Sequence, residues 1–367
     1  MKEEAYWYWL CNRRVLGAVK MGRLLKAFGS PEGIWRAGEA ELADRGGLRP
    51  GEAAEVFRGR GELDACAEEA ERLIGRGIRM IPITGAAYPD RLRRIPDPPA
   101  CLFVKGTLPP PEAPSAAVVG ARGCTAYGQL QAEQIAGELA AAGCWIISGL
   151  AYGIDAAAHR GAVRAGGRTC AVLGCGVDLC YPEENYPLYE EILQRGGGIL
   201  SEFPPKTPPL KQNFPIRNRV ISGLADAVLV MEARKRSGSL ITVEKALEQG
   251  KEIFALPGRA DDPLSRGCLE LIRDVAHILT EASDVLTALS LSPAQSLNYC
   301  EEAKFPLAEE EKLVYSAIAN SPKHRDEILR ELKIPESRVH AALLNLELSG
   351  AVRQTAKNYF VRTGSRN

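Results

Sequence analysis

Between residues 116 and 280, short apolar runs alternate with Gly-rich turns and amphipathic helical segments. The apolar runs are AAVVG (116–120), CWIISG (144–149), TCAVLG (169–174), GGILSE (197–202), AVLVMEA (227–233), EIFALPG (252–258) and AHILT (276–280). Helices are predicted near 126–142, 155–165, 184–195 and 239–249. Continuous apolar strands separated by helices indicate a parallel sheet covered on both faces. Because strand–helix–strand connections are right-handed, the pattern predicts an α/β fold with a Rossmann-like, doubly wound parallel sheet.

Different patterns lie on either side of this region. Residues 1–75 form Ala-, Leu-, Glu- and Arg-rich segments broken by Gly-rich turns, which predicts an all-helical domain. Within it, residues 42–57 loosely resemble a helix-hairpin-helix, although a plain structural bundle is favoured. Two short strands, RMIPI (79–83) and CLFVK (101–105), follow that helical segment.

The C-terminal part has the element order of a winged helix. Three helix-like stretches are predicted near 308–319, 324–332 and 336–348, and 351–362 resembles a hairpin. The third stretch is poorly basic, so a packing or protein-contact role is at least as well supported as DNA reading. The expected domains are a helical domain (1–75), a Rossmann-like domain (76–290), a linker (291–305) and a winged helix (306–367).

Composition narrows the class of protein. The chain has 367 residues, 46% of them apolar and 25% charged, as in soluble globular proteins. Its formal net charge is zero, so affinity for a polyanion must come from a local patch. No apolar run approaches the roughly 20 residues of a membrane span, and the acidic N-terminus does not resemble a signal peptide. We therefore expect a cytoplasmic protein without a membrane partner.

The ten cysteines form no C-x-x-C pair, and no histidine lies at ligand spacing from them. Reduced thiols are expected, with no metal site. Catalytic chemistry is not indicated either, because Ser148, Ser201 and Ser237 have no clear base. Asp155 and His159 could share a helix face, but Asp155 is interpreted as an N-cap. His277 is expected to be buried in its strand. The sequence thus predicts no catalytic residue, no metal ligand and no cofactor.

A local basic patch is the main chemical signal. Seven basic residues and only two acidic ones, Asp226 and Glu232, lie between residues 206 and 236, which gives a local excess of five positive charges. The basic residues are Lys206, Lys211, Arg217, Arg219, Arg234, Lys235 and Arg236. In doubly wound sheets, ligands bind beyond the carboxyl ends of the strands, where the Gly-rich turns lie. Exposed Gly amides with several cations predict a site for the repeated phosphates of a polymer.

The segment NFPIRNRVIS (213–222) raises a question of its own. It is interpreted as a helix start with Pro215 at the first position, which places Arg217 and Arg219 in the first turn. Cations are unfavourable at the positive end of a helix dipole unless an anion bridges them to the free amides. One of the two arginines is expected to pair with Glu202 or Glu232. Arg217 is the preferred ligand contact.

Several motifs, in this order, resemble the DNA processing protein A family, also called DprA/Smf. They are VVGARGCTAYG, SGLAYGIDAAAH, AVLGCGVDLCYPEEN, LSEFPP, FPIRNRVISGLADAVLVMEARKRSGSLIT and FALPG. The resemblance spans about 80–280 and, more weakly, both ends. It implies an extended Rossmann domain that binds single-stranded DNA, a helical N-terminal domain similar to the SAM fold, and a winged helix. It also implies a cytoplasmic homodimer, not an enzyme, that protects incoming DNA and loads the RecA recombinase in natural transformation.

The same resemblance assigns the expected DNA contacts. The family's V-G-x-R arginine falls on Arg122, its F-P-x-R-N-R element on 214–219 and its S-G-S loop on 237–239. The full expected set is Gly120, Arg122, Ser148, Gly149, Lys211, Phe214, Arg217, Asn218, Arg219, Lys235, Arg236, Ser237, Gly238 and Ser239. Among the nearby aromatic residues, Tyr152 is the preferred candidate for stacking on unpaired bases.

Two other functions remain open. The first is a nucleotide phosphoribohydrolase of the "lysine decarboxylase-like" group, which shares this Rossmann variant and has a P-G-G-x-G-T-x-x-E loop. Here the corresponding stretch, 237–244, keeps Glu244 but lacks the glycine pair. The second is a winged-helix regulator with a nucleotide-sensing domain, which the poorly basic third helix argues against.

Overall fold

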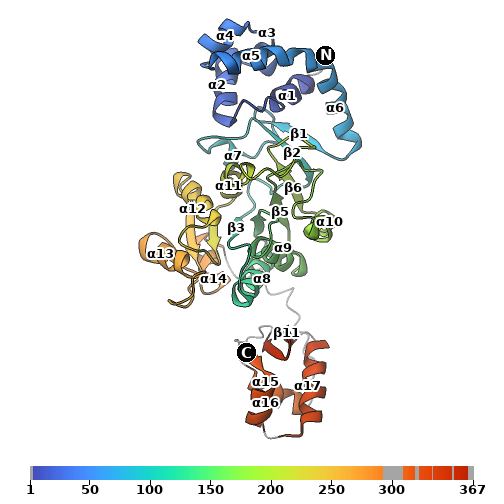
Figure 1. The fold of residues 1–367 in the computed structure, drawn as a ribbon, viewed down its shortest axis with the longest axis vertical. Coiled ribbons are helices and arrows are strands. Elements are labelled where there is room, and N and C mark those ends of the chain that lie inside the picture. Colours follow the sequence, from blue (N-terminus) through green and yellow to red (C-terminus); the bar gives the residue numbers. More distant parts are fainter. Residues whose placement is uncertain (1–2, 292–308, 319–321, 333, 349–350, 363–367) are drawn as a thin grey trace.

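The computed structural model describes residues 3–291, 309–318, 322–332, 334–348 and 351–362. Along the chain, a helical region is followed by a large α/β region and then by a small C-terminal region (Figure 1). The predicted linker at 291–305 lies, apart from its first residue, outside the described residues. No helix among the described residues is long and apolar enough to cross a membrane.

The N-terminal region is helical, as its composition predicts. Its elements are α1 (Glu3–Cys11), α2 (Ala18–Phe28), α3 (Pro31–Arg36), α4 (Glu39–Asp44), α5 (Pro50–Arg58), a 3₁₀ turn (Gly59–Glu62) and α6 (Leu63–Gly75). Trp9 is fully buried, and its indole nitrogen donates to the carbonyl of Gly59 at 2.8 Å. Tyr8 packs edge-on against Phe103 of the α/β region, with ring centroids 6.0 Å apart. The helices therefore share a hydrophobic core with the sheet.

The α/β region is built on one nine-stranded sheet. Its strands are β1 (Arg79–Pro82), β2 (Cys101–Gly106), β3 (Ser115–Val119), β4 (Trp145–Ser148), β5 (Thr169–Val172), β6 (Gly198–Ser201), β7 (Ala227–Val230), β8 (Glu252–Ala255) and β9 (His277–Ile278). Their spatial order is β1-β2-β6-β5-β4-β3-β7-β8-β9. The strands from β6 to β9 in this order are parallel, which confirms the predicted doubly wound sheet. Strand β2 pairs antiparallel with β6, and β1 pairs antiparallel with β2.

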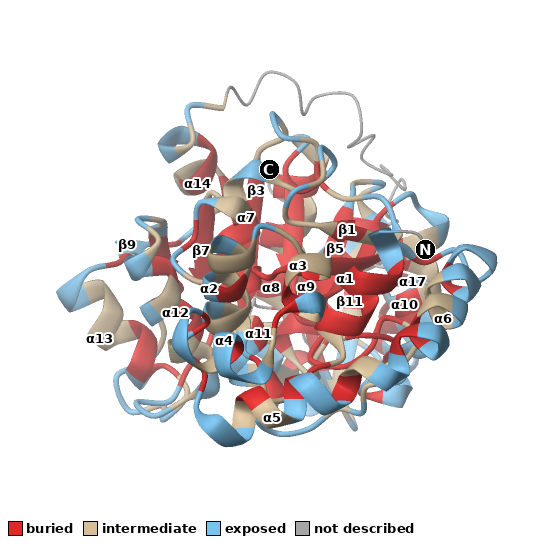
Figure 2. Ribbon diagram, turned by 90° about the horizontal axis from the view of Figure 1, so that it is seen from above, coloured by how far each residue is buried: buried red, intermediate tan, exposed pale blue. Residues whose placement is uncertain are grey.

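Helices cover both faces of the sheet. They are α7 (Asp90–Arg93), α8 (Ala126–Ala141), α9 (Ile154–Arg164), α10 (Tyr186–Gln194), α11 (Asn213–Leu224), α12 (Gly238–Glu248), α13 (Arg266–Asp274) and α14 (Ala282–Ala288). Alternate residues of a strand point to opposite faces. Accordingly, Val118 of β3 packs in one core with Ile135 of α8, while Val119 packs in another with Val220 of α11. Buried residues therefore fill the centre of the molecule (Figure 2).

The chain runs outward from β3 through β4 and β5 to β6, then returns to place β7 on the other side of β3. The strand order thus reverses between β3 and β7. Such a switch point leaves a crevice beyond the carboxyl ends of the two strands, and this crevice is the usual ligand position in doubly wound sheets.

The C-terminal region has the predicted winged-helix order. Its elements are α15 (Glu309–Ala317), β10 (Lys323–His324), α16 (Arg325–Leu332), α17 (Glu336–Leu348), β11 (Val352–Ala356) and β12 (Tyr359–Arg362). The three strands form a sheet in the order β10-β12-β11. Val339 and Leu343 of α17 pack with Ile328 and Phe360 in a separate core.

Two local predictions were wrong. Helix α11 begins at Asn213, so Pro215 occupies its third position, and Arg217 and Arg219 lie in its second turn rather than its first. The two arginines therefore lie largely outside the first turn, where the positive end of the helix dipole would have been unfavourable for them. His277 is exposed, because β9 is a two-residue edge strand that leaves its side chain at the rim of the sheet.

Candidate nucleic-acid interface

A cavity of about 550 Å³ lies in the crevice between β3 and β7. Its walls come from the turn after β3, the start of α11 and the start of α12. Of the residues expected to contact DNA, the following line it: Gly120, Arg122, Lys211, Phe214, Arg217, Asn218, Ser237, Gly238 and Ser239. The fold therefore brings together segments that are more than 100 residues apart in the chain.

The turn that carries Arg122 is fixed by Glu232, a buried residue just after β7. Its carboxylate accepts hydrogen bonds from the Thr125 backbone at 2.8 Å and the Thr125 hydroxyl at 2.5 Å. Its carbonyl accepts one from the Ala121 backbone at 2.8 Å. Gly128 admits this carboxylate, since an added Cβ there would lie 2.3 Å from the Glu232 Cδ. Glu232 thus orders the turn and leaves Arg122 exposed. Because the Glu232 carboxylate binds Thr125, Glu232 is not the carboxylate that pairs with Arg217 or Arg219.

Phe214 lines the cavity and lies beside three other side chains. The Cζ atom of Arg122 lies 5.1 Å from its ring centroid, and that of Arg217 lies 5.9 Å away. Tyr181 approaches the same ring, with centroids 5.6 Å apart and planes tilted by 42°. Guanidinium groups over an aromatic face interact favourably with its electron density. The ring therefore organises two cations and a second aromatic side chain around one space.

Arg217 is buried, with 4% of its surface exposed. Its guanidinium donates to the carbonyl of Gly149 at 3.0 Å and to the carbonyl of Val172. Gly149 directly follows β4, and Val172 is the last residue of β5, so both carbonyls lie where the pairing of the parallel strands ends. Arg217 therefore joins the carboxyl ends of β4 and β5, and only part of its side chain borders the cavity. Burial lowers the pKa of Arg217 to about 10, although the charge of Asp155 opposes the shift.

Asp155 is not the N-cap that the sequence suggested. The N-cap of α9 is Gly153, and the Asp155 carboxylate turns back to accept the amides of Gly149 at 3.1 Å and Ala151 at 3.4 Å. Burial raises the pKa of Asp155, while the charge of Arg217 acts in the opposite direction. Asp155 therefore fixes the turn after β4 beside Arg217.

Arg219 does not face the cavity. It is 3% exposed and forms two parallel hydrogen bonds of 2.7 Å to the carboxylate of Glu202. Its Nε lies 3.1 Å from a carboxylate oxygen of Asp97. Burial lowers the pKa of Arg219, but the two carboxylates outweigh that effect and leave the pKa raised. The expected pairing with Glu202 is thus formed, and it engages both Nη atoms of a guanidinium that is almost fully buried.

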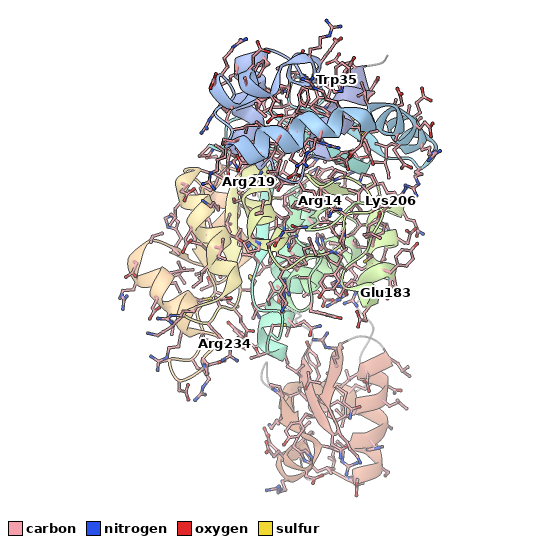
Figure 3. The ribbon with its side chains drawn as sticks, turned by 45° about the horizontal axis from the view of Figure 1, so that its top comes forward. Arg14, Trp35, Glu183, Lys206, Arg219 and Arg234 are labelled. Atoms are coloured by element: carbon pink, nitrogen blue, oxygen red, sulfur yellow. The ribbon has the colours of Figure 1, made fainter. Side chains whose placement is uncertain are left out.

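Other expected contacts also lie away from the cavity. Ser148 is fully buried and donates to the Val118 carbonyl at 2.6 Å, and Gly149 is buried beneath Arg217. The Nζ of Lys235 lies 2.5 Å from the Oε1 of Glu270. Neither Lys235 nor Arg236 lines the cavity. Arg234 lies well away from Arg219, at another part of the α/β region (Figure 3). The two basic clusters therefore do not meet around one pocket.

Tyr181 is a cavity residue that the sequence analysis missed. It is 41% exposed and follows β5 in the loop CYPEEN, beyond the carboxyl end of that strand. An aromatic residue in this position could have been noted from the strand pattern. The preferred stacking candidate, Tyr152, instead donates to Glu184 at 2.6 Å and does not line the cavity.

The fold and the cavity define a doubly wound α/β protein with a cationic, aromatic pocket at its topological switch point. A model of the family described as DNA recombination-mediator protein A matches residues 79–290, and a model of the DprA winged helix domain matches residues 301–357. The chain belongs to this DprA/Smf family.

Individual relatives agree with that assignment. Protein Smf from Synechocystis is 33% identical over 96% of this chain and 97% of its own length. DNA processing protein DprA from Streptococcus pneumoniae is 46% identical over 54% of this chain and 70% of its own. A solved structure of DprA from S. pneumoniae has a TM-score of 0.68 at 36% identity, covering 78% of this chain and 98% of that one. DNA processing protein A from Helicobacter pylori, described for its single-stranded DNA binding mode, has a TM-score of 0.51 at 28% identity, covering 58% and 95%.

Proposed function

We propose that this protein binds single-stranded DNA in the cavity between β3 and β7. The observation that carries the proposal is the exposed Arg122 held over Phe214 at the mouth of a pocket of about 550 Å³. Exposed cations that follow a backbone, together with aromatic rings on which bases stack, are the usual means of binding unpaired strands. The described relative from H. pylori supports the same ligand.

Each wall of the cavity supplies a different interaction. Arg122 and the exposed Lys211 provide charges for phosphates, while the rings of Phe214 and Tyr181 provide apolar faces for bases. The N-terminus of the eleven-residue helix α12 opens beside them, with the Ser237 hydroxyl accepting its Ser239 amide at 3.4 Å. Free amides at a helix N-terminus favour anions. We assign Arg217 a supporting role, because the side chain is 4% exposed and its Nη1 donates to the carbonyls of Gly149 and Val172.

A gel-shift experiment tests the proposal directly. An oligonucleotide and a duplex of the same length are compared at two salt concentrations, beside an assay for nucleoside monophosphate hydrolysis. We expect tighter binding of the single strand and weaker binding at the higher salt. Equal affinity for the duplex at matched salt, or hydrolysis without DNA binding, would refute the proposal.

The phosphoribohydrolase alternative is not favoured. Its acidic residue would fall on Glu244, which is exposed on α12 and does not line the cavity. Among the described residues, the hydrogen-bond partners of the Ser237 hydroxyl are the hydroxyl of Ser239 at 2.8 Å and the backbone amide of Ser239 at 3.4 Å, and neither is a base for nucleophilic attack. We therefore propose that the protein acts by binding and not as an enzyme.

The family supports the rest of the proposal. We infer a cytoplasmic protein that protects incoming DNA and loads RecA in natural transformation, with domains at 1–75, 76–290 and 306–367. We also propose a homodimer through the Rossmann domain. The rim at β9 is suitable, because Val275 and Ile278 are 45% and 55% exposed beside an open strand edge. Sedimentation of the intact chain, with and without Ile278→Asp, tests the dimer, and a RecA strand-exchange assay tests loading.

A further inference from the structure

The cavity between β3 and β7, referred to below as the DNA pocket, has room for only a short part of a strand. Its volume of about 550 Å³ is that of a site for one small molecule. Domains that bind unpaired strands commonly contact about 4–16 nucleotides. If the pocket binds DNA, as proposed above, the strand must leave it and continue along the surface of the protein.

The loop that follows β7 leads from the DNA pocket to helix α13. Ser237, at the end of this loop, lines the pocket. The amide of Ala233 donates to the Leu264 carbonyl at 2.7 Å, and the amide of Gly267 donates to the Ala233 carbonyl at 2.8 Å. The loop is therefore held against the start of α13, directly beside the pocket.

Three exposed arginines of this surface have no protein partner. Among the described residues, neither a hydrogen bond nor an ion pair engages the side chains of Arg234, Arg236 and Arg266. The cations around them are neutralised, because Lys235 pairs with Glu270 and Arg259 pairs with Asp261. The three unpaired guanidinium groups are available to phosphates.

An exposed aromatic ring lies on the same side of the pocket. Tyr127, in the first turn of α8, is 46% exposed. Its hydroxyl donates to the carbonyl of Pro257, just beyond the end of β8, at 3.1 Å. Because β8 follows β7 in the sheet, this bond holds the ring toward α13 rather than toward β4. Cations that follow a backbone and a ring on which a base stacks are the two features of a single-strand site.

The opposite side of the pocket is unfavourable for a phosphate backbone. Tyr152, which follows β4, is 43% exposed, but its hydroxyl donates to the carboxylate of Glu184 at 2.6 Å. Glu183 is exposed on the same loop and lies well apart from Arg234 (Figure 3). Carboxylates repel phosphates. The charges therefore favour an exit from the pocket toward α13.

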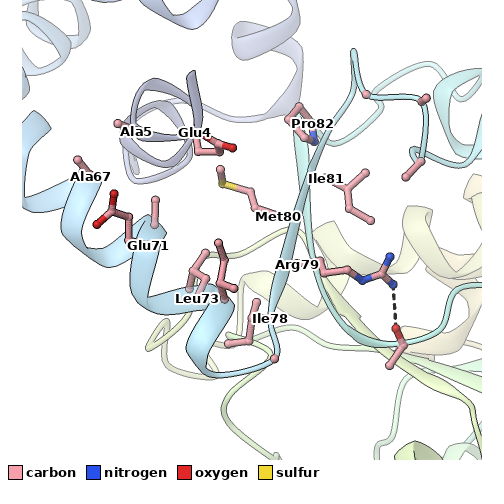
Figure 4. Close-up of a pocket in the computed structure, with 17 residues that line it drawn as sticks. Glu4, Ala5, Ala67, Glu71, Leu73, Ile78, Arg79, Met80, Ile81 and Pro82 are labelled. Atoms are coloured by element: carbon pink, nitrogen blue, oxygen red, sulfur yellow. Dashed lines mark hydrogen bonds between the residues drawn. The ribbon is translucent and has the colours of Figure 1, made fainter. Parts of the chain in front are cut away.

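A larger cavity, of about 1040 Å³, lies between α1, α6 and β1 and does not continue the DNA pocket (Figure 4). The two cavities share no lining residue. Arg79 is the one cation among the described residues that line the larger cavity, and it donates to the carbonyl of Gly106 at 2.8 Å (Figure 4). The carboxylate of Glu4 also lines this cavity. A phosphate backbone is therefore not favoured there.

We propose that a single strand bound in the DNA pocket leaves it on the side of β7 and β8 and continues along the start of α13. One base stacks on the ring of Tyr127, and the unpaired arginines contact the phosphates that follow. The residues of this surface, which we call the α13 track, are Tyr127, Arg234, Arg236 and Arg266.

The test compares the full chain and its variants on oligothymidylates of about four and about twenty residues, by fluorescence anisotropy. The double variant Arg234→Ala/Arg266→Ala should lose at least about tenfold more affinity for the long strand than for the short one. With the long strand, the slope of log K against log salt should be less steep by about 1.4, which is about 0.7 for each lost phosphate contact. Arg195→Ala is the matched control, because Arg195 is an exposed arginine at the end of α10, at the amino edge of the sheet.

Variants of the two tyrosines test the direction of the strand. Tyr127→Leu should weaken binding of the long strand at least about fivefold, because the stacked base loses its aromatic partner. Tyr127→Phe should keep the affinity, since the ring remains. Tyr152→Leu should also keep it, although Tyr152 is nearly as exposed as Tyr127. An unchanged affinity of Tyr127→Leu for the short strand shows that the pocket is intact.

The outcomes separate this inference from the proposed function. If neither strand binds, or if Arg122→Ala affects neither, both proposals are wrong. If both strands bind through Arg122 but the α13-track variants bind the long strand as tightly as the unmodified chain, only the α13 track is wrong. A loss with Tyr152→Leu and none with Tyr127→Leu would place the strand over the acidic loop instead.

Discussion

The guanidinium of Arg122 lies over the ring of Phe214, with 5.1 Å between its Cζ atom and the ring centroid. Arg217 approaches the same ring from within the protein, at 5.9 Å. The charge of Arg122 contributes to lowering the pKa of Arg217, after the larger effect of burial. Two like charges beside one ring are unfavourable, and the charge of Asp155 opposes this effect at Arg217 without cancelling the lowered pKa. This relationship makes the pocket suited to a phosphate.

Replacement of Arg122 tests that electrostatic argument. Arg122→Ala should weaken binding to a single-stranded oligonucleotide and make the slope of log K against log salt less steep by about 0.7, as expected for the loss of one phosphate contact. Arg259→Ala is a matched control, because Arg259 is exposed, pairs with Asp261 and lies outside the cavity. An unchanged salt slope in folded Arg122→Ala protein would contradict the assignment.

Gly149 is required by the close approach of Arg217 and Asp155. A Cβ added at Gly149 would lie 2.5 Å from both the Arg217 Nη1 and the Asp155 Oδ2. These groups are buried and hydrogen-bonded, so they cannot move freely. We expect Gly149→Ala to reduce the free energy of unfolding by about 1–3 kcal/mol and to weaken DNA binding.

The matched control is Gly123→Ala, because a Cβ at Gly123 has no atom within 4 Å. Urea unfolding of the three proteins gives the comparison. The argument fails if both alanine variants unfold at the same urea concentration as the original chain.

Arg219 should contribute to stability rather than to DNA contact. Arg219→Met leaves the carboxylates of Glu202 and Asp97 in a partly buried site without their cation. Breaking a buried pair by removing one partner costs about 3–5 kcal/mol. We expect a lower urea midpoint and an unchanged oligonucleotide affinity for the folded protein.

A double variant distinguishes the stability that the Arg219–Glu202 ion pair contributes from the stability that the packing of the two side chains contributes. Because the two residues are in contact, the effects of Arg219→Met and Glu202→Gln should not add, and the double variant should be more stable than their sum predicts. Additive losses would indicate that the ion pair contributes little, and a large loss of DNA affinity would return Arg219 to the binding surface.

Much of the architecture could be predicted because it depends on periodicity. Apolar runs such as AVLVMEA give strands, and the Gly-rich turns between them mark the carboxyl edge of the sheet. The antiparallel pairing of β2 with β6 and of β1 with β2 could not be predicted, because a short apolar run does not indicate the direction in which its strand will pair.

Side-chain partners were harder to predict than elements. Arg217 and Arg219 are two residues apart on α11, so they point to different sides of the helix. Their partners, the Val172 carbonyl and Asp97, come from distant segments that only the fold brings close. The sequence could therefore indicate that the two arginines differ. In the structure Arg217 lines the pocket, whereas Arg219 lies below the N-terminal helices (Figure 3).

His159 should make the stability of the α/β region depend on pH. It is fully buried, and its Nδ1 is 2.6 Å from the Thr169 hydroxyl. That hydroxyl donates to the Ile146 carbonyl, so it must accept from a protonated Nδ1. Protonation of Nε2 would then place a charge at an atom with no hydrogen-bond partner among the described residues. Burial accordingly lowers the pKa of His159 to about 3.

The sign of the effect follows from proton linkage. Between about pH 6.5 and pH 3, the unfolded histidine binds a proton and the folded one does not. The free energy of unfolding therefore falls as the pH falls, by up to about 1.4 kcal/mol per pH unit. From pH 7 to pH 5, His159 alone should remove about 2 kcal/mol.

Urea midpoints at pH 7, 6 and 5 check this expectation. His159→Gln should be less stable at pH 7, but its stability should decline less steeply toward pH 5, because the variant has no proton to gain at this position. His277→Gln is the control, since His277 is an exposed histidine of the same domain. It should keep the steep decline of the unmodified chain. If His159→Gln keeps that decline too, the acid sensitivity arises from other groups.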